Sequence, residues 1–214
     1  MIRRTRLCGA ALATVAALAL SACGGSSSSG HAGTGSSGSP GASSLPVPRG
    51  VTLTRQGTRL RLGQAATVAW RPSQKKVGVA TIAVTRLDTV PVSAFDAFQL
   101  NPATRRSTPY YVHATVRNVG RSNLSNVPVP LYLLERNTLL QSSTFTAQYA
   151  PCSSRPLPAH FRPGSKARVC LMYFVPRHGK LDAISFRPTQ DFAAITWRGR
   201  VGGSKRGTKH EKKH

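Results

Sequence analysis

The sequence predicts one antiparallel β-sandwich over residues 46–200, with a non-globular segment on each side. Short runs rich in β-branched and aromatic residues recur at near-regular spacing, and proline or glycine separates them. Almost no stretch has the 3.6-residue period of an amphipathic helix. Short strands with almost no helix, in a domain of this size, are typical of two packed antiparallel sheets.

The expected strands follow from these runs in chain order. They cover residues 60–62, 67–70, 78–90, 110–119, 131–134, 168–175, 183–186 and 194–197. The clearest alternation lies between Tyr110 and Val119, where every second side chain up to Val116 is apolar. That pattern places one face in the core and the other toward solvent. Residues 93–100 have weak helical character, because Ser93 stands three residues before Asp96 as in a capping box.

The N-terminus has the pattern of an exported lipoprotein. Basic residues precede a short apolar stretch, Leu7–Leu20, which is well below the ~20 residues that span a membrane. Leu20-Ser21-Ala22-Cys23 then resembles a bacterial lipobox. We expect cleavage of residues 1–22 and lipidation of Cys23, with each buried CH₂ contributing ~0.8 kcal/mol to membrane anchoring. The alternative is an ordinary secretory leader in which Cys23 is incidental.

Two segments flank the expected domain. Residues 23–45 are almost all Gly, Ser, Ala and Thr, a composition that favours a flexible tether with a root-mean-square reach of roughly 25 Å. Residues 201–214 consist mostly of Gly, Lys, Arg and His and are expected to form a disordered basic tail. The sandwich is therefore expected at the extracytoplasmic face of the cell membrane, held by a lipid anchor.

The chain is strongly basic, with 30 Lys and Arg against 6 Asp and Glu and a net charge of +24. Such a charge is compatible with nucleic-acid binding. The arginines are dispersed, however, and neither a helix-turn-helix nor a basic-aromatic stacking motif is present, so we expect no nucleic-acid partner. An envelope protein or an anionic wall or lipid polymer is the expected partner of a monomeric chain. The alternative is that the charge only keeps the domain soluble.

Two cysteines remain for the folded domain if Cys8 leaves with the leader and Cys23 carries lipid. Cys152 and Cys170 are then expected to form a disulfide in an oxidising compartment. Neither cysteine has a further metal-ligating residue beside it, and the histidines are scattered. We expect no metal and no cofactor.

The sequence contains no recognisable catalytic motif. It has no Gly-x-Ser-x-Gly turn, no phosphate-binding loop with the required spacing, and few carboxylates. We therefore expect a protein that is not an enzyme. The alternative is an envelope hydrolase in which His113, His160 or His178 meets an aspartate and a serine.

The long connection between residues 91 and 109 is the first candidate binding surface, because long loops in compact domains tend to be functional or disordered. It carries Phe95, Phe98, Arg105 and Arg106. The two phenylalanines either anchor a partner or cover an open end of the sandwich, and we favour the second interpretation.

The second candidate surface is the row formed by Tyr111, His113 and Arg117 on the outward side of the expected strand. This row either meets an anionic polymer or is an ordinary solvated sheet face, which we favour. A third candidate is the loop Cys152–Pro163, which its prolines and the expected disulfide would make rigid.

Several segments match, in order, the pattern of one protein family. They are TPYYVHATVRNVG at 108–120, VPVPLY at 127–132, FRPG at 161–164 before VCL at 169–171, and FRPT at 186–189 before ITW at 195–197. These segments resemble a family of actinobacterial lipoproteins with an immunoglobulin-like extracellular domain of unassigned function. More distantly, the chain is similar to secreted immunoglobulin-like antigens of mycobacteria. The resemblance implies an immunoglobulin-like sandwich and no particular chemistry, so a passive spacer or antigen is a further alternative.

Overall fold

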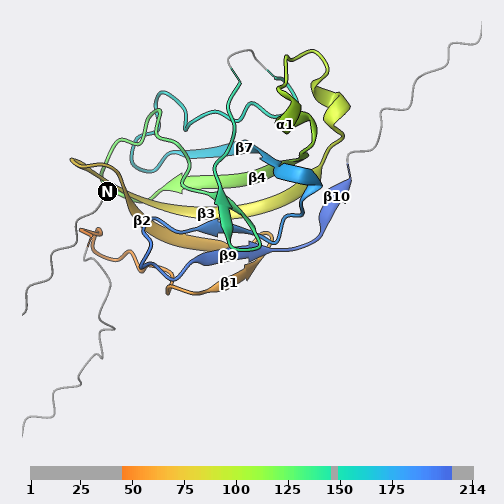
Figure 1. The fold of residues 1–214 in the computed structure, drawn as a ribbon. Helices are drawn as coiled ribbons and strands as arrows, with labels where there is room; N and C mark the ends of the chain where they lie inside the picture. Colours follow the sequence, from red (N-terminus) through yellow and green to blue (C-terminus); the bar gives the residue numbers. More distant parts are fainter. Residues whose placement is uncertain (1–44, 146–148, 204–214) are drawn as a thin grey trace, which may run out of the picture. The chain divides into compact units, whose positions relative to one another are not determined.

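The fold is an immunoglobulin-like β-sandwich, as the sequence predicts (Figure 1). A computed structural model describes residues 45–145 and 149–203. The first sheet has the order β1 (Arg59–Arg61), β9 (Ile195–Arg198), β8 (Ala183–Phe186), β5 (Tyr132–Glu135), β6 (Thr138–Leu140). The second has the order β10 (Val201–Gly203), β3 (Lys76–Thr89), β4 (Thr108–Asn118), β7 (Lys166–Val175), and β2 (Ala65–Ser73) also pairs with β3.

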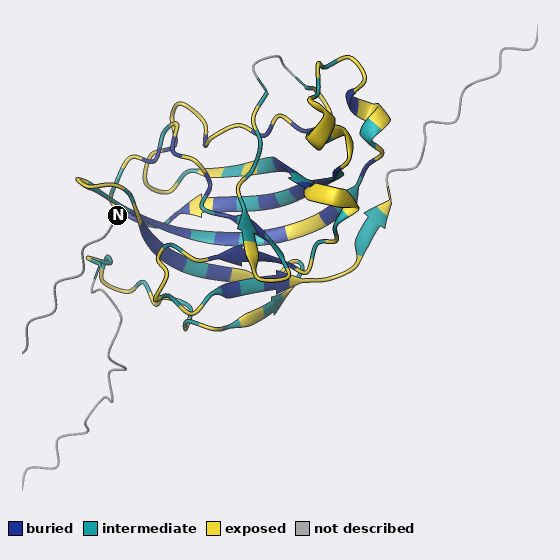
Figure 2. Cartoon of the chain, viewed as in Figure 1, coloured by how far each residue is buried: buried dark blue, intermediate teal, exposed yellow. Residues whose placement is uncertain are grey.

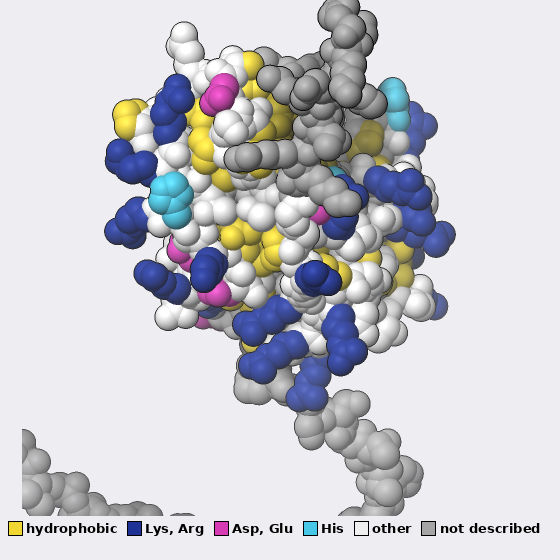
Figure 3. Space-filling view, turned by 90° about the vertical axis from the view of Figure 1, so that its right-hand side faces the viewer, with side chains coloured by type: hydrophobic (Ala, Val, Ile, Leu, Met, Phe, Trp, Pro, Cys, Tyr) yellow, Lys and Arg dark blue, Asp and Glu magenta, His cyan; other side chains and the backbone are white. Residues whose placement is uncertain are grey.

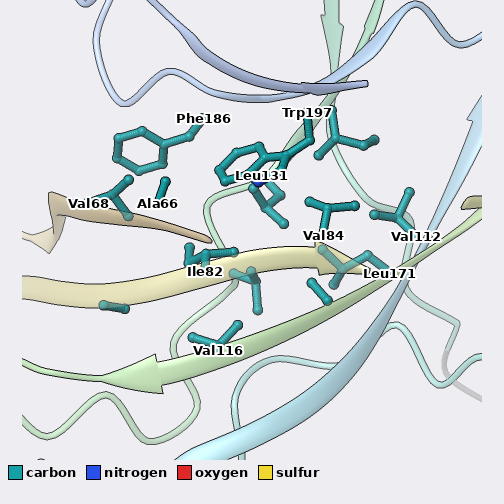
Figure 4. Close-up of a cluster of buried hydrophobic side chains, with 14 of the residues drawn as sticks. Ala66, Val68, Ile82, Val84, Val112, Val116, Leu131, Leu171, Phe186 and Trp197 are labelled. Atoms are coloured by element: carbon teal, nitrogen blue, oxygen red, sulfur yellow. The ribbon is translucent and has the colours of Figure 1, made fainter. Parts of the chain in front are cut away.

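The main core lies between the two sheets (Figure 4). The alternation expected in β4 is confirmed, because Tyr110, Val112, Ala114 and Val116 all belong to this core. Buried and partly buried residues alternate along the middle of the long strands of the second sheet, at Ala80–Val84 in β3 and Val112–Val116 in β4 (Figure 2). Trp197 is fully buried, and its indole Nε1 donates a hydrogen bond of 2.9 Å to the carbonyl oxygen of Gln64. Its polar atom is thus satisfied where burial would otherwise destabilise the fold.

The structure adds elements that the sequence pattern does not predict. Strand β6 forms a hairpin with β5, and β10 pairs in parallel with β3 at Leu87–Thr89. The domain therefore continues past residue 200, where the sequence placed its end. At Gly202 a Cβ atom would stand 2.8 Å from an Asp88 carboxylate oxygen, so a larger residue there would require the Asp88 side chain to move.

The helical segments also differ from the expectation for residues 93–100. The 3-10 helix η1 (Val92–Phe95) begins after Pro91 without a side-chain cap, so Ser93 is not the capping residue. A further short helix, α1 (Pro102–Arg105), is capped by Asn101, whose side-chain oxygen accepts a 2.8 Å hydrogen bond from the Thr104 amide. A second 3-10 helix, η2 (Pro176–His178), follows β7. None of the helices in the described ranges is long and apolar enough to cross a membrane.

The disulfide between Cys152 and Cys170 is present, with the two Cα atoms 5.2 Å apart. Cys170 lies in β7 next to the core residue Leu171 and alternates with it, so its side chain is on the outer side of the sheet. The bond therefore fastens a loop to the outside of the second sheet and does not join the two sheets.

Replacing both cysteines by serine should lower the free energy of unfolding by about 3 kcal/mol, because the closed loop spans 18 residues. Urea denaturation of the oxidised protein and of the Cys152→Ser/Cys170→Ser variant measures this difference. Equal midpoints and slopes for the two proteins would contradict the prediction.

Gly78 and Trp70 are paired across β2 and β3, and the Trp70 ring occupies the space that a side chain at position 78 would need. A Cβ atom there would be 2.8 Å from the nearest ring carbon. Gly78→Ala should therefore destabilise the fold by about 1–3 kcal/mol through overpacking. Gly203→Ala is the matched control in thermal denaturation, since a Cβ at that position meets nothing within 4 Å. A Gly78→Ala variant as stable as this control would show that the Trp70 ring moves freely.

Candidate functional site

A second, smaller apolar cluster covers the outer face of β4 and β7, on the side away from the main core. Phe95 is fully buried at its centre, with its ring centroid 5.0 Å from that of Tyr149 and 5.1 Å from that of Phe174. Phe98 is half-buried beside it, 4.7 Å from Phe145. The two phenylalanines are thus neither exposed anchors nor the cover of an open end of the sandwich, because they cover a sheet face.

The expected row of Tyr111, His113 and Arg117 does not form one solvated surface. Tyr111 is buried in the second cluster, and its hydroxyl lies 2.6 Å from that of Tyr149. Burial and this hydrogen bond raise the pKa of the Tyr111 phenol well above its usual value. His113 is partly buried, and Arg117 is exposed. The pattern within β4 does not show this cover, because the cluster combines Phe95 and Phe98, from the connection just before β4, with Phe145 and Tyr149 from farther along the chain.

His113 belongs to a polar group with Arg86 and Asp88 on the same outer face. A β-bulge between Val84 and Arg86 returns Leu87 to the core and turns Arg86 and Asp88 outward. The Arg86 Nε donates to Asp88 Oδ2 at 2.7 Å, and the Arg86 Nη2 lies 2.8 Å from His113 Nε2.

The protonation of His113 decides which of these contacts is favourable. Because arginine can only donate, its contact requires an unprotonated Nε2 that accepts. A protonated ring would instead donate from Nε2 to Asp88 Oδ2, which is 3.2 Å away. Burial and the Arg86 charge lower the pKa of His113, while Asp88 opposes them. The folded protein therefore favours the neutral ring.

The environment of His113 does not assemble a hydrolytic triad in the part of the chain that the structure describes. The remaining polar neighbour of its ring is the Cys170 sulfur at 4.0 Å, and no serine hydroxyl is among the ring's partners. His160 is exposed in a turn, and His178 is exposed at the end of η2. Within residues 45–145 and 149–203, no cluster of His, Cys, Asp or Glu could hold a metal ion.

The other basic candidates are separate from this group. Arg105 and Arg106 are exposed at the end of α1, where the Arg105 Nε donates to the Leu100 carbonyl oxygen at 3.1 Å. The carbonyl oxygen of Arg106 accepts a hydrogen bond from the His178 amide. The loop Cys152–Pro163 contains buried Leu157 and Phe161, which belong to the main core. The sequence-predicted candidates thus occupy several places and do not converge on one cleft.

A further basic feature, not anticipated from the sequence, is an arginine strip on β1 and β9. We define it as Arg59, Arg61 and Arg198, all exposed. Parallel pairing places Arg61 directly opposite Arg198, and Arg59 lies two residues along β1 on the same face. Like charges in direct cross-strand register are unfavourable in a sheet.

Positive charge is largely unpaired on the described surface. Lys and Arg side chains are scattered over the face in Figure 3, and acidic ones are few. Arg86 with Asp88 is the one ion pair between Lys or Arg and a carboxylate among the residues that the structure describes. The arginine strip therefore has no acidic partner in that part of the chain.

Comparison with protein-family models, with curated proteins and with solved structures found no match. The function proposed below therefore relies on the residues of this chain alone.

The stability of the fold should depend on pH through His113. A histidine whose folded-state pKa is depressed stabilises the protein above its ordinary pKa of about 6.5, and this contribution is lost as the pH falls. We expect the free energy of unfolding to decrease between pH 7 and pH 5, as measured by urea denaturation at several pH values.

His113→Gln should weaken this pH dependence, whereas His160→Gln should preserve it because His160 is exposed. An unchanged slope in His113→Gln would mean that other groups cause the dependence.

Proposed function

We propose that the chain is a cell-envelope lipoprotein, anchored through Cys23, whose immunoglobulin-like sandwich binds an anionic partner outside the cell without catalysis. The anchoring part of the proposal is supported by the leader and the lipobox-like Leu20–Cys23 sequence, which lie outside the described residues. The binding part is supported by the basic surface of the sandwich.

The arginine strip is the observation that carries the binding proposal. Three exposed guanidinium groups share one sheet face, with two of them in direct register and no carboxylate paired with them in residues 45–145 and 149–203. A surface of anionic headgroups or a polymer of repeated phosphate groups relieves the repulsion between them. Each basic residue near such a surface contributes about 1 kcal/mol.

Vesicle sedimentation tests the strip directly. The unlipidated chain without its leader (residues 23–214), carrying Cys23→Ala, is incubated with vesicles of phosphatidylcholine alone or with added phosphatidylglycerol. A form ending at Gly203 keeps β10 and separates the sandwich from the basic residues of the tail. We expect binding to the anionic vesicles only, weakening as the salt concentration rises.

The variant Arg59→Gln/Arg61→Gln/Arg198→Gln should bind anionic vesicles about a hundredfold more weakly. The matched control, Arg121→Gln/Arg162→Gln/Arg168→Gln, removes the same charge from exposed positions outside the strip. It should lose clearly less affinity. Equal losses in the two variants would mean that net charge, and not the strip, determines binding.

A specific binding domain and a passive spacer would give different cross-linked products in intact cells. Cross-linking with the full chain, the Cys23→Ala form and the Gly203-terminated form should capture one discrete partner through the sandwich if a specific binding domain is present. Diffuse, salt-sensitive capture that disappears with the tail would instead favour a passive spacer or antigen. The hydrolase alternative has no supporting observation among the described residues, because His113 has no serine beside it.

A further inference from the structure

A pocket of about 480 Å³ opens beside β2, and no residue of the arginine strip lines it. Its lining comes from both sheets and from the segment that precedes β1. Its volume lies within the range of small-molecule sites in proteins.

The inner part of this pocket is apolar. Val68, Trp70 and Ile195 line it and belong to the main core, so a ligand there would extend the core between the sheets. Leu53 lines the same pocket and is 39% exposed, the one exposed large apolar side chain in the part of the chain that the structure describes. An apolar occupant would remove this side chain from water, which is favourable.

The charged groups of the pocket are all positive. Arg55 and Arg71 line it, both are exposed, and its lining contains no Asp or Glu. Neither arginine forms an ion pair with a carboxylate within residues 45–145 and 149–203. An apolar interior combined with two free guanidinium groups is complementary to a molecule that has one apolar chain and one acidic end.

We propose that this pocket binds a single-chain lipid with an anionic headgroup. The acyl chain lies against Trp70 and Leu53, and Arg55 and Arg71 hold the headgroup. The site is distinct from the arginine strip, so it goes beyond the proposed function. Lipid binding to the pocket is measured without vesicles. A negative result for the pocket therefore does not contradict the proposal for the arginine strip, and the reverse also holds.

Binding of cis-parinaric acid, a fluorescent long-chain fatty acid, to the chain without the leader (residues 23–214) and carrying Cys23→Ala tests the site. Trp70 lines the pocket, so energy transfer from tryptophan to the bound probe is expected. The methyl ester of the same acid keeps the chain and removes the charge.

Arg55→Gln/Arg71→Gln should weaken binding of the acid about tenfold and leave the ester unaffected, because only the acid makes a charge-assisted contact. Leu53→Gln should weaken binding of both probes. Arg162→Gln, an exposed loop arginine outside the pocket, is the control that should change neither. All four positions are exposed, so circular dichroism should show an unchanged fold.

Three results would overturn the proposal. They are the absence of saturable binding of the acid, equal affinity for acid and ester, and binding that neither the arginine variant nor Leu53→Gln weakens. Displacement of the probe by an acidic peptide, with no displacement by unlabelled fatty acid, would also overturn it by assigning the pocket to a protein partner.

Discussion

Strand β4 must be covered on both faces, and much of the surrounding structure depends on that requirement. Its inward side chains, such as Val112, pack in the main core, and its outward Tyr111 is buried in the second cluster. A strand at the centre of a sheet leaves its outer face to water unless another layer lies over it. Here loops supply that layer, and the disulfide to Cys170 fastens one of them to β7.

The loops that cover the outer face of β4 also explain why His113 is neutral in the folded protein. The residue lies between Arg86 on one neighbouring strand and Cys170 on the other, at the border of the covered region. Partial burial makes a charged imidazole unfavourable, and the guanidinium beside it acts in the same direction. The neutral ring is therefore a consequence of packing, and it needs no catalytic role to explain it.

The sequence predicts the strands well because their signals are local. Alternation identifies β4, β-branched residues identify β3, and an apolar run identifies β7. Strand β10 escapes prediction because two of its three residues are glycine and offer no side-chain pattern. The covered outer face is also missed, since Tyr111 and His113 look like solvent-facing residues until the connection before β4 and the later residues 145 and 149–152 are placed over that face. The arginine strip depends on the register between Arg61 and Arg198, which no local pattern contains.

The position of the arginine strip has a consequence for how copies of this protein behave when they are crowded in one plane. Strand β1 is at the edge of its sheet, and an edge strand with free backbone groups is a template for pairing with a second chain. This edge is only three residues long and carries Arg59 and Arg61. Two copies approaching edge to edge would bring these guanidinium groups together. The like charges that repel each other within one molecule would then also repel the second copy and oppose aggregation.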